Sequence, residues 1–112
     1  MAMKEIQKVW GKELIIANTE KYAGKILVID KRAISSLHQH LKKDETFLCI
    51  EGKVILTVGN ETHCLGPYSD PVHIPPGSWH VFKGLENSKI VEVSTEHKEE
   101  DVERKTCSSP GY

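Results

Sequence analysis

Residues 38–58 read HQHLKKDETFLCIEGKVILTV, and they contain the clearest β-hairpin signal in the 112-residue chain. Apolar residues predominate over 47–51 and again over 53–58, on either side of Gly52. Glycine adopts a positive φ without steric cost, which suits the turn between two paired strands. We therefore expect an antiparallel hairpin over residues 47–58 with Gly52 at its turn.

Short apolar segments, each closed by turn-forming residues, recur on both sides of this hairpin. They cover residues 13–17, 25–30, 46–51, 53–58, 62–65, 72–74, 80–82 and 89–95. Many short strands at even spacing are typical of a β-sandwich or barrel. We expect a single all-β domain over residues 1–112, with the barrel core at about residues 10–96. The first ten residues are expected to form at most one helical turn, and residues 97–112 a polar tail that is short and helical or irregular.

The composition of the chain argues against nucleic acid and membranes as partners. The chain has 15 Lys and Arg residues against 16 Asp and Glu residues, so it lacks the basic stripe that nucleic acid requires. No apolar run approaches the roughly 18–20 residues that span a bilayer, and the N-terminus lacks the apolar stretch of a secretory signal. The three cysteines fit neither a disulfide framework nor a zinc ribbon. We expect a cytoplasmic protein that binds neither nucleic acid nor membrane, and its six histidines are the unusual feature.

Three of these histidines and one glutamate are candidate metal ligands. On a strand, residues two apart point to the same face, so His38 and His40 can address one ion. Glu45 can return to that site after a short turn, and His80 follows the turn residues Pro75–Gly77. Imidazole and carboxylate groups suit first-row transition metals, and four ligands leave two open positions on an octahedral ion. The identity of this divalent metal (Mn, Fe, Zn, Ni or Co) stays open.

The same residues resemble the two motifs of the cupin superfamily. The first motif reads H-x-H, four residues, E, six residues, G, and residues 32–52 match it except that Arg32 replaces the opening glycine. The second motif reads P-x-G-x-x-H and is matched by Pro75, Gly77 and His80, although Gly84 stands at its asparagine position. The resemblance covers about residues 10–104 and implies a double-stranded β-helix, the cupin jelly-roll barrel.

A narrower resemblance is to sugar-isomerase cupins, which include the cupin domain of bifunctional mannose-6-phosphate isomerases and the lyxose isomerases. It rests on Trp10-Gly11, on Lys25 and on the stretch EVSTEH at residues 92–97, followed by Glu100-Asp101 and Arg104. In lyxose isomerases, a lysine well before the H-x-H and a glutamate in the late E-x-S-T strand lie beside the metal. The resemblance therefore implies catalytic roles for Lys25 and Glu92.

The positions of Lys25 and Glu92 in their strands allow two interpretations. Lys25 alternates in phase with Leu27 and Ile29, so an inward face would carry its ammonium group into the barrel. Glu92 lies among apolar residues, where burial would raise the pKa of its carboxyl group. The alternative is that both side chains face solvent.

The leading functional hypothesis is a metal-dependent isomerase that acts on a sugar or sugar phosphate. The alternatives are a non-haem iron dioxygenase-type cupin and a non-enzymatic cupin that binds a sugar or a metal, because one fold hosts many chemistries. We expect a homodimer, since exposed edge strands need to be covered. The remaining histidines are expected to be ordinary surface or pocket-wall residues, with His97 solvated in the tail. These are His63, His73 and His97.

Overall fold

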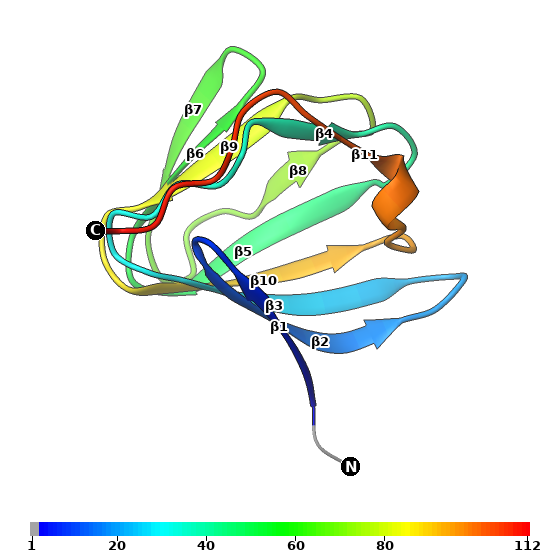
Figure 1. The fold of residues 1–112 in the computed structure, drawn as a ribbon, viewed down its shortest axis with the longest axis horizontal. Coiled ribbons are helices and arrows are strands. Elements are labelled where there is room, and N and C mark those ends of the chain that lie inside the picture. The colour runs from blue at the N-terminus through cyan, green and yellow to red at the C-terminus, as the bar shows by residue number, and fades with distance from the viewer. Residues whose placement is uncertain (1–2) are drawn as a thin grey trace.

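The computed structural model describes residues 3–112, which form eleven β-strands and one 3₁₀ helix. Figure 1 shows these elements arranged as two sheets that face each other. The elements in chain order are β1 (Lys4–Lys8), β2 (Gly11–Asn18), β3 (Ala23–Ile29), β4 (His38–His40), β5 (Glu45–Glu51), β6 (Val54–Val58), β7 (Glu61–Leu65), β8 (Val72–Ile74), β9 (His80–Gly84), β10 (Ser88–Ser94), η1 (Glu99–Asp101) and β11 (Val102–Arg104). None of the described residues belongs to a helix long and apolar enough to cross a membrane.

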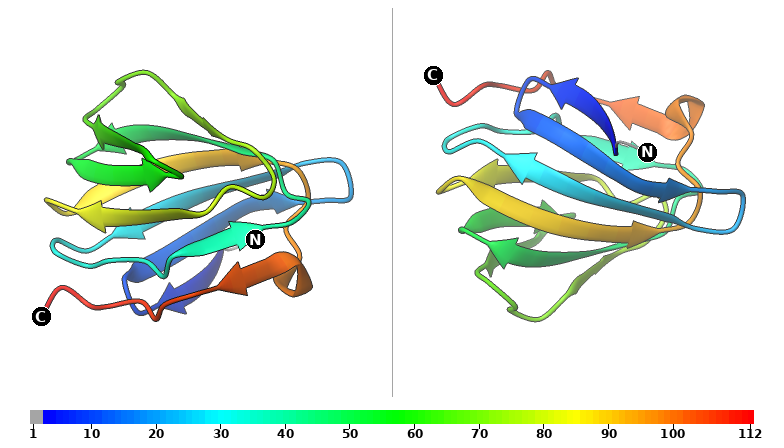
Figure 2. Two further views of the ribbon diagram at one scale, coloured as in Figure 1. Left: turned by 90° about the horizontal axis from the view of Figure 1, so that it is seen from above. Right: turned by 90° about the horizontal axis from the view of Figure 1, so that it is seen from below.

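One sheet has six strands in the order β1-β2-β3-β10-β5-β8, and the other has five in the order β11-β4-β9-β6-β7. All neighbouring strands pair antiparallel. The two further views in Figure 2 look onto the five-stranded sheet from one side and onto the six-stranded sheet from the other. This arrangement is the expected cupin jelly roll.

The core fills one part of the space between the sheets. Strands β3 and β5 alternate strictly between buried and half-buried residues, as expected when one face of a sheet packs inward. The buried apolar side chains include Leu27, Ile29, Phe47, Cys49, Leu56, Phe82 and Ile90. Cys49 packs there as a small hydrophobe.

Strand β10 lies between two strands that precede it by many residues. It pairs with β3 on one side and with β5 on the other, so Glu92 has Lys25 and Phe47 as its neighbours across the sheet. The burial pattern of β10 directs Ser88, Ile90 and Glu92 inward. The carboxyl group of Glu92 therefore enters the space between the sheets.

Both chain ends are more regular than the sequence predicts. Residues 4–8 form a strand that pairs with β2, so the expectation of a helical turn is wrong. After residue 96, the chain forms η1 and then β11, which pairs with β4 and thereby with the strand that carries His38 and His40. Neither strand could be predicted from its sequence, because each has at most one apolar residue that faces the interior.

Two turn residues at glycine positions of the first motif, Arg32 and Gly52, have positive φ angles. Arg32, which replaces the opening glycine of the first motif, has a φ of 70°. This left-handed conformation costs a non-glycine residue about 1–2 kcal/mol, which is why glycine suits the position. Gly52 has a φ of 83°, and an added Cβ would lie 2.4 Å from the Asn87 backbone oxygen. The hairpin turn therefore requires glycine at position 52.

Candidate metal centre

Two strands of the five-stranded sheet bring the three motif histidines together. His38 and His40 lie on β4, and His80 begins β9, where it is the register partner of His38. The ring centroids of His38 and His80 are 4.2 Å apart. One ligand-type atom from each of the three residues lies within 4.8 Å of the other two, so these side chains can hold one metal ion.

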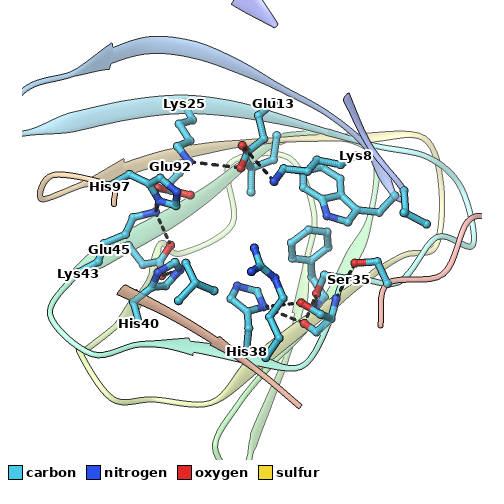
Figure 3. A pocket seen from close by; sticks show the side chains of 18 of the residues that line it. Lys8, Glu13, Lys25, Ser35, His38, His40, Lys43, Glu45, Glu92 and His97 are labelled. Carbon is cyan, nitrogen blue, oxygen red and sulfur yellow. Dashed lines mark hydrogen bonds and ion pairs between the residues drawn. The ribbon is translucent and has the colours of Figure 1, made fainter. Parts of the chain in front are cut away.

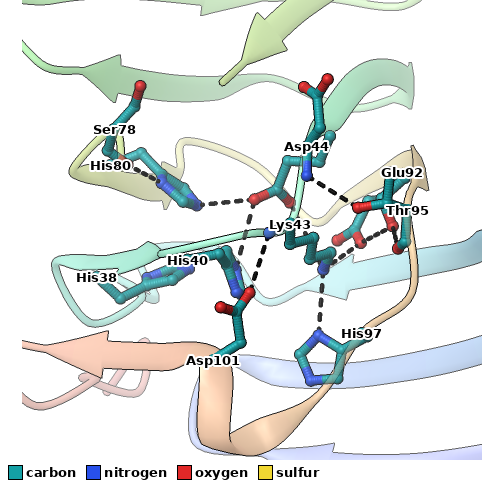
Figure 4. Close-up of polar contacts among 12 residues, drawn as sticks. His38, His40, Lys43, Asp44, Ser78, His80, Glu92, Thr95, His97 and Asp101 are labelled. Atoms are coloured by element: carbon teal, nitrogen blue, oxygen red, sulfur yellow. Dashed lines mark hydrogen bonds and ion pairs between the residues drawn. The ribbon is translucent and has the colours of Figure 1, made fainter. Parts of the chain in front are cut away.

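Backbone carbonyl groups determine which nitrogen of two rings carries the proton. The Nδ1 atom of His38 lies 2.8 Å from the Ser36 carbonyl oxygen, and Nδ1 of His80 lies 2.9 Å from that of Ser78 (Figure 4). A carbonyl oxygen only accepts hydrogen bonds, so each Nδ1–H must donate. Each Nε2 is then left with a free lone pair, as in metal-ligating histidines that are held by their other nitrogen.

Glu45 begins β5 and points at the histidines. Its Oε2 atom lies 3.4 Å from Nε2 of His40 and 3.5 Å from Nε2 of His80. Among the described residues, Oε2 of Glu45 and Nε2 of His80 are buried side-chain atoms without a hydrogen-bond partner. An anionic oxygen that faces a nitrogen lone pair at this distance is unfavourable unless a cation or proton lies between them. The donor set therefore fits a divalent transition metal.

The charge states of these groups also suit metal binding. Burial, followed by the neighbouring His80, lowers the pKa of His38 to about 4. Burial likewise lowers the pKa values of His40 and His80, so all three rings are neutral near pH 7. Burial and then the nearby Glu92 raise the pKa of Glu45 to about 8. A bound cation would favour the ionised carboxylate over this protonated form.

Lys43 links the candidate ligands to Glu92. Its Nζ atom lies 2.6 Å from Oε2 of Glu92, 3.8 Å from Oε1 of Glu45 and 3.2 Å from Nδ1 of His97 (Figure 4). Burial alone would raise the pKa of Glu92, but the ammonium groups of Lys43 and Lys25 outweigh it and hold this pKa below its ordinary value. The expectation of a raised pKa at Glu92 is therefore wrong, because the sequence did not reveal Lys43 as its partner.

Lys25 lies on the same inner surface of the sheet as Glu92. Its side chain is buried, and its Nζ atom lies 3.3 Å from Oε2 of Glu13 on β2. Lys25 and Glu92 are 2% and 3% exposed, so the interpretation that they face solvent is wrong. Both enter the space between the sheets, as the alternation of their strands predicts for an inward face.

These side chains, apart from that of His80, line one cavity of about 260 Å³ (Figure 3). The histidines of β4, Glu45, Lys43 and Glu92 stand on one part of its wall, and Glu13 and Lys25 stand opposite His38. An apolar part of the wall is formed by Trp10, Leu27, Phe47 and Phe82. Lys8 on β1 and Glu99 and Arg104 near the C-terminal end also line the cavity.

A model of the family described as mannose-6-phosphate isomerase C-terminal matches residues 1–106. The chain belongs to this family. The family is one of cupins, so the superfamily expected from the two histidine motifs is confirmed. A comparison with curated protein sequences gives no match.

Solved cupin structures share the fold of this cupin at low sequence identity. KdgF from Halomonas sp. has a TM-score of 0.72 and 21% identity, over 80% of this chain and 81% of KdgF. Oxalate decarboxylase from Bacillus subtilis has a TM-score of 0.79 and 20% identity, over 91% of this chain but only 30% of its own. A Streptomyces PAC13 variant with uridine has a TM-score of 0.81 and 13% identity, over 94% of this chain and 85% of its own. At these identities the likeness concerns the fold alone.

Three further residues of the cavity were not predicted as part of the site. Lys43 follows a turn, where strand alternation predicts no direction, and Glu13 was grouped with the apolar segment of β2. His97 was expected to be solvated, but its side chain is only 19% exposed and contacts Lys43, so that expectation is wrong. The link between the polar C-terminal segment and the cavity depends on β11, which composition did not predict. His63 on β7 and His73 on β8 lie outside this cavity.

Proposed function

We propose that this cupin is a metal-dependent enzyme that interconverts an aldose and a ketose, either free or phosphorylated. His38, His40, Glu45 and His80 would hold the divalent metal, and Lys25 and Glu92 would act on the substrate. The observation that carries the proposal is the shared cavity: two buried lysine–carboxylate pairs line the same space as the neutral candidate ligands His38 and His40. A buried ionisable group in such a cavity is a reasonable candidate for proton transfer.

In this reaction a proton moves from the hydroxyl-bearing carbon to the neighbouring carbonyl carbon, and the hydroxyl proton passes to the former carbonyl oxygen. A divalent cation supplies polarisation of the substrate hydroxyl and carbonyl oxygens when it is bound. Glu92 is held ionised by Lys43 and Lys25, which is the state that a proton acceptor needs. Lys25 donates hydrogen bonds from a buried position and would orient a substrate oxygen beside Glu92.

The first test concerns the metal. We expect the protein purified with Mn²⁺, Fe²⁺ or Zn²⁺ to contain about one metal ion per chain, as measured by elemental analysis. The double variant His38→Ala/His40→Ala should lose this ion, because it removes two of the four donors. A matched His63→Ala/His73→Ala variant removes two histidines outside the cavity and should keep it. Metal retained in the first variant would contradict the ligand assignment.

The second test concerns the reaction. Metal-loaded protein is assayed against a panel of aldoses, ketoses and their phosphates, with product formation measured by chromatography. We expect Glu92→Gln to lower kcat at least about a hundredfold, the usual contribution of a general base, while metal content is unchanged. Unchanged turnover in Glu92→Gln would rule out its role as the base. Oxygen uptake with Fe²⁺ in place of isomerisation would instead favour the dioxygenase alternative.

A further inference from the structure

The charged side chains of the cavity are already paired with one another. Deep in the cavity, Lys43 lies 2.6 Å from Glu92, and Lys25 lies 3.3 Å from Glu13. Each of these four side chains is at most 12% exposed. Two buried ion pairs therefore form the polar wall beyond the histidines.

Glu13 holds a second lysine as well. Its Oε2 atom contacts Lys25, while its Oε1 atom lies 3.9 Å from Nζ of Lys8, which comes from β1. Figure 3 shows Lys8, Glu13 and Lys25 together on the side of the cavity opposite His38. The carboxylate of Glu13 thus forms ion pairs with two ammonium groups, which would otherwise form a cationic site.

The last lining cation is paired too. Nη2 of Arg104 lies 3.6 Å from Oε2 of Glu99, so every lysine and arginine that lines this cavity has a carboxylate within 4.0 Å. The described lining contains four such cations, and it contains four glutamates, of which Glu45 faces the histidines. No part of the polar wall has the unpaired cluster of cations that a phosphate dianion requires.

This polar wall would bind hydroxyl groups more favourably than phosphate groups. A phosphate group would meet the carboxylate of Glu13 at short range, and separating a buried lysine from that carboxylate is costly. A hydroxyl group donates to a carboxylate and accepts from an ammonium group at the same time. A polyol can therefore bind between the partners without separating them.

We propose that the cavity accepts an uncharged polyhydroxy compound of monosaccharide size and discriminates against its phosphate ester, with Glu13 setting this preference. The inference rests on the proposed use of the cavity as the substrate site. The volume of about 260 Å³ is below the usual range of roughly 300–1,000 Å³ for ligand pockets, which favours a small ligand. In a sugar phosphate whose carbonyl end faces the histidines, the phosphate at the far end of the carbon chain would lie on the side of Glu13 and Lys8, opposite His38.

Calorimetry on the metal-loaded full chain tests this preference with mannose, mannose 6-phosphate and inorganic phosphate as probes. Wild type should bind mannose more tightly than mannose 6-phosphate, and inorganic phosphate weakly or not at all. Glu13→Gln leaves Lys8 and Lys25 without their carboxylate, so it should raise the affinity for both phosphate compounds at least about tenfold. Affinity for mannose should change much less, because the amide still offers hydrogen bonds.

Glu5→Gln is the matched control. Glu5 lies on β1 of the same hairpin and pairs with the exposed Lys12 at 3.7 Å, outside the cavity lining. It changes the net charge equally and should leave all three affinities as in wild type. The inference is overturned if wild type prefers mannose 6-phosphate, or if folded Glu13→Gln binds inorganic phosphate no better than wild type.

These binding outcomes are separate from those of the proposed function. If no sugar is turned over, the isomerase proposal fails while the affinity ratios still stand. If neither sugar binds, inorganic phosphate still tests the role of Glu13, and the comparison in wild type does not depend on the folding of any variant. A protein that isomerises only phosphorylated sugars would keep the proposed function and overturn this inference.

Discussion

At the scale of single residues, Lys43 determines how the two cavity carboxylates share charge. It contacts Glu92 at 2.6 Å and Glu45 at 3.8 Å, and both carboxylates raise the pKa of the lysine against the effect of its burial. The closer carboxylate keeps a lowered pKa, whereas that of Glu45 is raised to about 8. The ammonium group therefore stabilises the ionised form of Glu92 and leaves Glu45 dependent on a cation at the histidines.

The second residue with a marked effect is His97, which leads to a prediction about pH. Burial, and then Lys25 and Lys43, lower its pKa to about 4 in the folded protein, against an ordinary value of 6.5. Between these values the unfolded chain binds a proton that the folded chain does not, so His97 makes stability fall as the pH falls. We expect the Tm of metal-free His97→Gln to decline less between pH 6.5 and pH 4 than that of wild type, as measured by circular dichroism.

His63→Gln removes a histidine from β7, outside the cavity, and controls for the loss of a ring elsewhere. Its Tm should follow the wild-type decline. If the Tm curves of wild type and His97→Gln run parallel across this pH window, His97 has no such role.

At the scale of elements, the short 3₁₀ helix η1 fixes the turn that follows the two histidines of β4. The carboxylate of Asp101 accepts hydrogen bonds from the backbone N–H groups of Lys42 at 2.9 Å and Lys43 at 3.0 Å (Figure 4). Asp101 is itself buried, so these bonds are shielded from water. The C-terminal segment therefore positions Lys43 between Glu45 and Glu92.

This contact predicts the effect of Asp101→Asn. The amide keeps the size of the side chain but turns one acceptor into a donor that faces a backbone N–H group. We expect the free energy of unfolding to fall by about 1–3 kcal/mol, the cost of an unsatisfied buried donor. Urea denaturation measures this change. Glu103→Gln on the exposed side of β11 is the control, and equal stability of Asp101→Asn and wild type would show that the contact is unimportant.

Some strands and side-chain positions could be predicted from the sequence, and others could not. Strands that coincide with short apolar segments, such as β3, β5 and β10, were predictable, and one face of each is buried. The H-x-H pair and its spacing to Glu45 and His80 were predictable because metal ligands leave a fixed pattern. Strands β1 and β11 were not, because polar edge strands depend on pairing with a distant partner. The position of the Lys43 side chain was not predictable either, because its direction depends on a turn and not on the alternation of a strand.

At the scale of the whole molecule, the outer face of the six-stranded sheet is notably apolar. Ile16 on β2 and Val93 on β10 are 56% and 57% exposed. They lie on either side of Gly24, whose register partner is Val93 and whose missing side chain leaves room beside Ile16. Aliphatic side chains exposed together on a flat sheet, beside the edge strand β1, favour association with a second copy.

We therefore predict a homodimer that uses this face. Light scattering coupled to gel filtration should give twice the mass of one chain for wild type. Ile16→Lys/Val93→Lys places two charges on the face and should give the mass of one chain, because burying unpaired charges is costly. The exposed charge addition Thr62→Lys on β7 is a control that should stay dimeric. A wild-type monomer, or a dimer that survives the double substitution, would contradict this interface.

The place of β10 between β3 and β5 has a consequence for the order of folding. The two halves of the six-stranded sheet meet only through a strand that follows β3 by some sixty residues, at positions 88–94 against 23–29. Until that strand arrives, β3 and β5 each expose an unpaired edge, and such late, long-range pairing slows folding. Glu92 enters the cavity in this same step. During synthesis on the ribosome, the histidines of β4 therefore emerge long before Glu92, and a cation that binds to them early does so in an incomplete barrel.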